Sequence, residues 1–273
     1  MSKKILLAAG CSYTDKNFRS SDDSLPDVGR SGWPMWPELM ANELNLECVN
    51  LGKSGASSDF IFREVIKGIA SHGDKIDTIA ILWSGADRES FYTFDFNALM
   101  EVYNDYGNNS KITSWMDDIG IGEINKKFWN NKNFNKDVYK NMIESQLSRM
   151  IAIIDICKAR NIKLIMGQGL TFFSFWVLDE MQKEGRLNPA AYIDKSQTIQ
   201  YFMDNPMFDQ IEKTKNSIIG WPFWPLLNGY FLDILRYDHK ENCFISDKDK
   251  HPNKLGQEIF AQEFINKYKE LYI

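Results

Sequence analysis

A serine placed just after a short apolar run is the first residue whose position suggests chemistry. The run Ile5–Ala9 ends at Gly10, and Ser12 follows two residues later. A glycine at the end of a buried strand allows a sharp turn, and such a turn lets the next serine project its hydroxyl from the end of the sheet. A serine hydroxyl is a poor nucleophile at neutral pH and needs a neighbouring base, which is normally a histidine. The chain must therefore supply a histidine that reaches Ser12.

The chain has three histidines, and their surroundings differ. His72 lies in a connection from a predicted helix to a predicted strand, at the edge of the sheet opposite the strand ends. His239 lies in a polar turn. His251 lies where a loop meets the last predicted helix, with Asp249 and Asp247 two and four residues upstream. Taken alone, His251 would be interpreted as a surface or capping residue. Because Ser12 at a strand end needs a base, His251 is the candidate for that role.

Two backbone N–H groups are candidates for stabilising an oxyanion. Gly55 lies in the polar segment that follows the second predicted strand, and its lack of a side chain leaves its N–H unobstructed. The N–H of Ser12 itself is the second candidate. Both Gly10 and Gly55 also suit ordinary turns, so neither glycine is specific by itself.

The elements that must position these residues alternate along the chain. Short apolar runs predict strands at Ile5–Ala9, Glu47–Leu51, Thr78–Trp83, Ile162–Met166 and Cys243–Ile245. Apolar stripes at helical spacing predict helices over 34–46, from Ser57–Asp59 onward, over 138–160, and from Pro252 to the end. Such alternation predicts a three-layer α/β/α fold with a flavodoxin-like, doubly wound, parallel five-stranded sheet. Ligands of such sheets bind beyond the carboxyl ends of the strands.

Two stretches interrupt the alternation. Residues 94–134 are rich in Asn, Gly and Asp, and residues 171–236 are rich in aromatic side chains. Because strands and helices resume after each stretch, both are interpreted as insertions into a single domain that spans residues 1–273.

Composition excludes several classes of protein. The net charge is −5, from 32 basic and 37 acidic residues, which argues against a nucleic-acid partner. No apolar run approaches the roughly 18 residues of a membrane span, and the run after Lys3 and Lys4 is too short for a signal peptide. The expected location is therefore cytoplasmic. Four cysteines without CxxC spacing predict neither a zinc site nor a disulfide framework.

Three segments resemble the SGNH, or GDSL, hydrolase family of esterases, lipases and carbohydrate deacetylases. Gly10–Asp15 resembles the family's first motif, Gly-Asp-Ser-x-Thr-Asp, which implies Ser12 as nucleophile. Asn50–Ser57 resembles the second motif, in which Gly55 supplies an oxyanion N–H. His251, followed by proline, resembles the last motif, in which the histidine is the base.

The resemblance covers residues 1–90 and 240–273, and the two insertions match nothing recognised. The extended pattern looks most like versions found in phages and environmental bacteria, which makes a phage-encoded or virion-associated protein one reading. The residues of that pattern are Trp33, Leu39, Asn50, Trp83 and Arg88.

The oxyanion motif departs from the family pattern. The family's Gly-x-Asn-Asp appears here as Ser84–Arg88, and neither Ala86 nor an ionised Asp87 offers the side-chain N–H of the missing asparagine. Loss of one such donor costs about 3 kcal/mol of transition-state stabilisation. Arg88 is the candidate substitute, because its guanidinium is a permanent donor, and it is alternatively a candidate substrate-binding residue. The alternative role of Arg88 is a salt bridge with Asp87 or Glu89.

The acid and the residue before the serine also depart. The family's acid usually stands three residues before the histidine, where this chain has Lys248. Asp249 and Asp247 bracket that lysine, and Asp249 is favoured because an Asp-x-His-Pro spelling resembles divergent relatives. Cys11 replaces an acidic residue that is not catalytic in the family, and it is a rival nucleophile to Ser12.

The resemblance implies a serine ester hydrolase that acts on a small ester or an O-acetylated carbohydrate and needs neither a metal nor an organic cofactor. In the aromatic stretch, Trp176, Trp221 and Trp224 either stack on sugar rings, line an acyl pocket, or pack the insertion against the sheet. Two alternatives remain open from the sequence. One is an O-acyltransferase that uses the same residues, and the other is a binding or structural protein that has lost efficient catalysis.

Overall fold

The structure, a computed structural model, describes residues 3–20, 22–25, 32–85, 136–169, 204–220, 231, 235 and 242–273. The first predicted insertion, residues 94–134, lies outside the described residues, as does most of the second.

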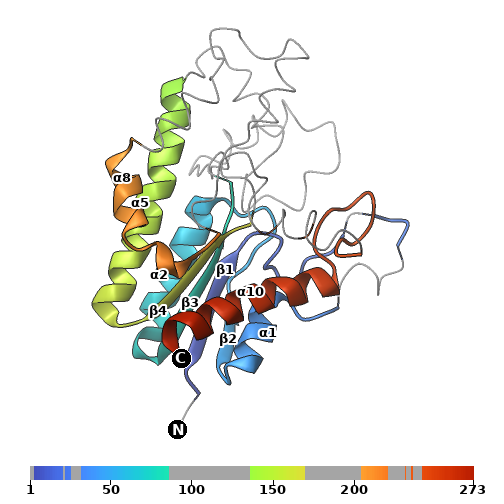
Figure 1. Cartoon of the computed structure of the whole chain (residues 1–273). Helices are drawn as coiled ribbons and strands as arrows, with labels where there is room; N and C mark the ends of the chain where they lie inside the picture. Colours follow the sequence, from blue (N-terminus) through green and yellow to red (C-terminus); the bar gives the residue numbers. More distant parts are fainter. Residues whose placement is uncertain are drawn as a thin grey trace, which may run out of the picture.

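A parallel sheet forms the centre of the fold (Figure 1). Its strands are β1 (Ile5–Gly10), β2 (Glu47–Asn50), β3 (Ile76–Trp83), β4 (Lys163–Gln168) and β5 (Ile218–Ile219). Their order is β2-β1-β3-β4-β5, the flavodoxin-like order, which confirms the predicted fold. Ala8 of β1 pairs with Asn50 on one side, and Gly10 pairs with Leu82 on the other. The chain changes direction across the sheet at β1, so the switch point lies at the end of the strand that precedes Ser12.

The fifth strand was predicted in the wrong place. The segment Cys243–Ile245 contributes only a single antiparallel bridge, between Phe244 and Pro252. The strand that extends the sheet is Ile218–Ile219, inside the range interpreted as the second insertion, and it pairs with Met166 and Gly167 of β4. Two isoleucines between Ser217 and Gly220 are too short a run for hydrophobic periodicity to identify as a strand.

Helices cover both faces of the sheet (Figure 1). They are α1 (Trp36–Glu43), α2 (Ser58–His72), α5 (Lys136–Arg160), α8 (Pro206–Glu212) and α10 (Lys254–Tyr272). α1 packs against α10 on one face, and α2 and α5 lie together on the other, with α8 against α5. None of the helices in the described ranges is both long and apolar enough to cross a membrane.

Side-chain caps fix the start of the two helices that border the strand ends. The Ser57 hydroxyl accepts a hydrogen bond from Phe60 N at 3.1 Å, so α2 begins at Ser58. Asn253 caps α10 by accepting from Gly256 N at 3.1 Å. The last helix was expected to open at Pro252, but the proline precedes the capping residue and lies outside the helix.

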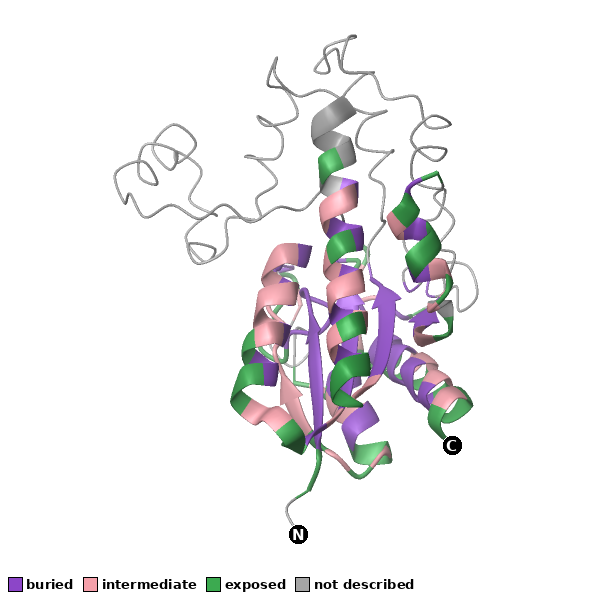
Figure 2. Ribbon diagram, turned by 90° about the vertical axis from the view of Figure 1, so that its left-hand side faces the viewer, coloured by how far each residue is buried: buried purple, intermediate pink, exposed green. Residues whose placement is uncertain are grey.

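The core consists of the strands and an aromatic layer. All six residues of β1 are buried, and Figure 2 shows the buried strands between helices that expose their outer faces. Trp36 of α1 stacks on Phe264 of α10 with a centroid distance of 4.1 Å, and Phe231 stacks on Phe264 at 5.3 Å. Stacked aromatic side chains therefore pack α1 and α10 together.

Candidate active site

Ser12 lies in a tight turn at the end of β1. The N–H groups of Thr14 and Asp15 both donate to the carbonyl of Cys11, at 2.9 and 3.1 Å. The turn folds Thr14 back over Gly10, where an added Cβ would lie 2.1 Å from the Thr14 hydroxyl. Ser12 itself is 8% exposed. The glycine is therefore needed for the turn that presents the serine, as the sequence suggested.

The segment after β2 is bonded to this turn. Asn50 Nδ2 donates to Thr14 O at 2.8 Å, and Lys53 N donates to Gly10 O at 3.1 Å. An added Cβ on Gly52 would lie 2.6 Å from the Thr14 carbonyl carbon, so the two backbones approach as closely as only glycine allows. Hydrogen bonds and close backbone contacts thus join the two loops into one unit.

Asp15 brings Gly55 into the same unit. Its carboxylate accepts from the backbone N–H and the hydroxyl of Ser54, at 2.9 and 2.7 Å. Gly55 follows with a φ of +78°, a left-handed conformation that favours glycine. Within the described residues, the N–H groups of Ser12 and Gly55 have no hydrogen-bond acceptor. Both N–H groups remain available as donors at this edge of the sheet.

The loop before α10 carries the histidine. Its two sides are joined by hydrogen bonds from Ile245 N to His251 O and from Asn253 N to Cys243 O, both at 2.9 Å. These bonds connect His251 to α10, whose cap Asn253 lies two residues further on. The position of His251 is therefore fixed by backbone contacts on both sides of the loop.

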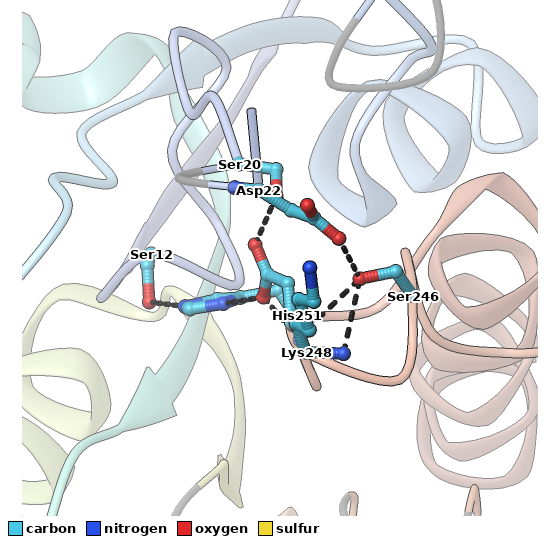
Figure 3. A network of polar contacts seen from close by, with 7 residues as sticks. Ser12, Ser20, Asp22, Ser246, Lys248 and His251 are labelled. Atoms are coloured by element: carbon cyan, nitrogen blue, oxygen red, sulfur yellow. Dashed lines mark hydrogen bonds and ion pairs between the residues drawn. The ribbon is translucent and has the colours of Figure 1, made fainter. Parts of the chain in front are cut away.

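His251 and Ser12 lie within hydrogen-bond distance although 239 residues separate them (Figure 3). The distance from His251 Nε2 to Ser12 Oγ is 2.9 Å. The imidazole packs against Phe18, with centroids 4.2 Å apart and planes at 32°, and meets Tyr13 edge-on at 5.3 Å. These two rings restrict rotation of the imidazole, and the histidine side chain stays 32% exposed.

Asp249 is the acid that contacts the imidazole. Its Oδ1 lies 2.5 Å from His251 Nδ1 and also accepts the backbone N–H of His251 at 2.9 Å. Asp247 points into solvent and pairs with Lys250 at 3.3 Å. Of the two acids that the sequence left open, the structure thus places Asp249, and not Asp247, beside the histidine.

The environment of Asp249 favours its ionised form. Burial disfavours the carboxylate, but hydrogen bonds from the His251 ring and from the Ser20 hydroxyl outweigh it and lower the pKa of Asp249 below its usual value. A carboxylate at Nδ1 holds the imidazole proton on that nitrogen, which leaves Nε2 to accept a proton from Ser12. The arrangement can therefore activate a serine hydroxyl.

A second polar network behind Asp249 was not anticipated from the sequence (Figure 3). The Ser20 hydroxyl donates to Asp249 Oδ2, and Asp22 N donates to Ser20 Oγ at 3.1 Å. Ser246 Oγ donates to Asp22 Oδ2 at 2.6 Å. Hydrogen bonds from Ser24 and then Ser246 lower the pKa of Asp22 to about 2. Serines and aspartates in loops are too common for their spacing to have indicated this network.

A buried set of hydrogen bonds, which the sequence also did not indicate, holds the turn that carries Ser12 from the other side. Trp36 Nε1 donates to Thr14 Oγ1 at 3.1 Å. The fully buried Gln257 of α10 donates from Nε2 to Tyr13 O at 3.1 Å and accepts from Trp36 N at 2.9 Å through Oε1. This one side chain joins α1, α10 and the turn. A glutamine beside an apolar stripe gives no signal of such a role.

Of the remaining candidate residues from the sequence, only Cys11 is among the described residues. Arg88, Trp176, Trp221 and Trp224 lie outside the described residues, as do the positions that correspond to the missing asparagine. Cys11 is described and fully buried, next to a serine that reaches a histidine. Across the described ranges, no three His, Cys, Asp or Glu side chains gather in a way that would hold a metal ion.

Comparison with known proteins finds no matching family model and no matching curated protein. Solved structures resemble the chain in outline. A lipolytic protein of the G-D-S-L family from Desulfitobacterium hafniense DCB-2 aligns with a TM-score of 0.47 and 12% identity over 97% of this chain and 99% of that chain. Axe2, an acetylxylan esterase from Geobacillus stearothermophilus, aligns with a TM-score of 0.42 and 15% identity over 97% and 94%. The esterase EstA from Pseudoalteromonas sp. aligns with a TM-score of 0.44 and 13% identity over 98% of this chain and 97% of that chain. With sequence identities of 12 to 15% and TM-scores below 0.5, the likeness to these three structures is distant.

Proposed function

We propose that this protein is a serine ester hydrolase of the SGNH type, with Ser12 as nucleophile, His251 as base and Asp249 as the orienting acid. One observation carries the proposal. Ser12 Oγ, the His251 ring and the Asp249 carboxylate form a continuous chain of contacts at 2.9 and 2.5 Å. That chain lies at the switch point of a parallel sheet, where ligands of such folds bind.

The reaction follows from these contacts. Ser12 Oγ attacks the ester carbonyl carbon while His251 Nε2 takes the hydroxyl proton, and the carbonyl oxygen becomes an oxyanion. The N–H groups of Ser12 and Gly55 donate to that oxyanion. When the intermediate collapses, the C–O bond to the alcohol breaks and His251 returns the proton to the leaving oxygen. Water, deprotonated by His251, then attacks the acyl carbon, the bond from that carbon to Ser12 Oγ breaks, and His251 returns the proton to Ser12 Oγ.

Asp249 acts through the imidazole. Its carboxylate keeps the proton on Nδ1 and stabilises the imidazolium that forms while His251 carries the serine proton. The Phe18 and Tyr13 rings hold the imidazole in the plane that joins Ser12 to Asp249. The base is therefore oriented by one charge and two aromatic contacts.

The substrate class in this proposal is a small ester or an O-acetylated carbohydrate. The sequence supports it through the resemblance of Gly10–Asp15 and Asn50–Ser57 to esterase motifs. Arg88 is proposed as the third oxyanion donor in place of the missing asparagine. Trp176, Trp221 and Trp224 are proposed as a platform for the sugar or the acyl chain.

Covalent labelling and hydrolysis test this function together. We expect a fluorophosphonate probe to label the wild type and Cys11→Ala but not Ser12→Ala. Hydrolysis of short acyl nitrophenyl esters and acetylated sugars should follow the same pattern. Labelling that survives in Ser12→Ala and disappears in Cys11→Ala would move the nucleophile to Cys11.

Two further outcomes separate the alternatives. One outcome is that the probe labels Ser12, but the acyl group of an ester substrate leaves the enzyme only when an alcohol or sugar is added. That outcome identifies an O-acyltransferase, which forms the same acyl-serine and differs in the acceptor. Absence of both labelling and hydrolysis in the folded wild type identifies a binding or structural protein.

A further inference from the structure

The second oxygen of the Asp249 carboxylate has a partner of its own. Oδ1 faces His251, and Oδ2 accepts a hydrogen bond from the Ser20 hydroxyl, which comes from a segment 229 residues earlier (Figure 3). We propose that Ser20 is a positioning residue of the catalytic site, which fixes the Asp249 carboxylate so that Oδ1 stays aligned with His251 Nδ1. This inference rests on the proposed hydrolase function, and it concerns a residue outside the motifs that suggested that function.

The carboxylate needs such a partner because it is buried on a loop. Asp249 is 7% exposed and belongs to residues 242–253, whose only strand-like pairing within the described residues is the bridge between Phe244 and Pro252. The terminal torsion of an aspartate is broad, so a carboxylate held at one oxygen alone can rotate. Ser20 is the donor that the described residues supply to Oδ2. Its removal leaves a buried, charged acceptor without a partner.

The direction of the Ser20 hydrogen bond follows from its other contact. Ser20 is 4% exposed, and its oxygen accepts the backbone N–H of Asp22 at 3.1 Å. A serine hydroxyl has one proton to donate, and an ionised carboxylate accepts only. The hydroxyl proton therefore points at Asp249. The backbone sets this orientation before any substrate arrives.

A second connection keeps the two segments together. Ser246 Oγ donates to Asp22 Oδ2 at 2.6 Å and accepts the backbone N–H groups of Lys248 and Asp249 at 3.2 and 3.1 Å. The segment that carries Ser20 and Asp22 is thus joined to the catalytic loop at two points. Ser20 contacts the Asp249 carboxylate itself, and Asp22 contacts Ser246, which binds the backbone beside that carboxylate. This double contact holds the loop at the distance that Ser20 requires.

The test compares Ser20→Ala and Ser20→Cys with the wild type. Cysteine retains the size of the side chain approximately but is a weak donor. Ser217→Ala is the matched control, because Ser217 is half-buried and its hydroxyl donates at 3.1 Å to Thr214 O, at the far edge of the sheet. The measurements are kcat and KM for a short acyl nitrophenyl ester, and the proton NMR resonance of His251 Nδ1–H, which is assigned by its loss in His251→Gln.

The positioning role predicts a specific pattern. In both Ser20 variants kcat should fall about ten- to a hundredfold, the effect of losing a hydrogen bond to a charged group, while KM stays within about twofold. The Nδ1–H resonance should broaden or vanish, because a mobile carboxylate no longer protects that proton from exchange. Ser217→Ala should match the wild type in all three measurements. If Ser20→Ala does not fold, Ser20→Cys alone provides the comparison.

Two results overturn the inference. One is a Ser20 variant that retains both wild-type kcat and the Nδ1–H resonance. The other is a variant whose kcat falls while the resonance stays unchanged, since Ser20 would then act on something other than Asp249. A wild type that hydrolyses no ester defeats the proposed function, but the resonance still reports whether Ser20 holds Asp249. The two failures are therefore distinguishable.

Discussion

Replacement of Asp249 by asparagine separates the electrostatic role of the acid from its structural role. The amide oxygen of an asparagine can take the place of Oδ1 and accept from His251 Nδ1 and from the backbone N–H of His251. The amide nitrogen then faces Ser20, whose oxygen has a lone pair beyond the one used by Asp22 N–H. The side chain fits, and what is lost is the negative charge.

The magnitude follows from the distance between the charges. With Nδ1 and Oδ1 2.5 Å apart, the centres of the imidazolium and carboxylate charges lie about 4 Å apart, which corresponds to about 4 kcal/mol at an effective dielectric constant of about 20. We expect kcat to fall about 10³-fold from this loss. If the amide rotates and forces the wrong tautomer, the loss approaches 10⁴-fold. The cost to folding should be near 1 kcal/mol, a shift in Tm of about 2–4 °C.

The assay is hydrolysis of a short acyl nitrophenyl ester by Asp249→Asn, with Asp247→Asn as the control. The Asp247 side chain is fully exposed and pairs only with Lys250 among the described residues, so its variant should stay within about twofold of the wild type. Thermal unfolding of both variants shows that the fold is intact. A large loss in Asp247→Asn beside an active Asp249→Asn would refute the reasoning and reassign the acid. Two active variants would indicate a Ser12–His251 dyad.

Three further predictions concern the surroundings of the site. Because the pKa of Asp22 is lower in the folded than in the unfolded chain, its carboxylate stabilises the fold at a pH above the unfolded pKa, and this stabilisation is lost as the pH falls. The difference in free energy of unfolding between the wild type and Asp22→Asn, measured with urea, should therefore be largest near pH 6 and shrink towards pH 2. Gly52→Ala should lower the free energy of unfolding by about 1–3 kcal/mol and reduce kcat, because the new Cβ displaces the Thr14 backbone; an unchanged Tm would contradict this. Gln257→Met should lower the free energy of unfolding by about 1–3 kcal/mol, measured by denaturant unfolding, because the thioether replaces neither the amide oxygen that accepts from Trp36 N nor the amide nitrogen that donates to Tyr13 O; an unchanged free energy of unfolding would contradict this.

The parts of the molecule that could be predicted share a physical signal that is local in sequence. Strand β1 is a continuous apolar run that ends at a glycine, and the cap at Ser57 immediately precedes an apolar stripe at helical spacing. Parallel strands place their carboxyl ends at one edge, so a serine after β1 and a histidine before the last helix could be expected to meet there. Their distance of 2.9 Å is consistent with that topological argument.

The parts that could not be predicted depend on tertiary contacts between ordinary residues. Strand β5 consists of two isoleucines whose strand conformation comes from pairing with β4. Ser20 and Gln257 carry no local pattern, and their roles arise because segments more than 200 residues apart bring single donors and acceptors together. Periodicity describes which face of an element is buried, but it does not describe which buried polar atom meets which partner.

The spacing of the acid has a physical explanation in this geometry. An aspartate side chain readily accepts the backbone N–H two residues further on, and Asp249 Oδ1 accepts His251 N at 2.9 Å in this way. The same oxygen then lies 2.5 Å from the ring nitrogen of the same histidine. A spacing of two therefore lets one carboxylate oxygen bind the backbone and the ring of His251 together, while Lys250 between them reaches out to Asp247 in solvent. An acid one residue earlier, at Lys248, would lose this shared contact with the backbone. In the proposed mechanism, therefore, no acid is needed at Lys248, the position usual in the family that the chain resembles, because the turn at Asp249 aligns one carboxylate oxygen with His251 and Ser20 donates to the other.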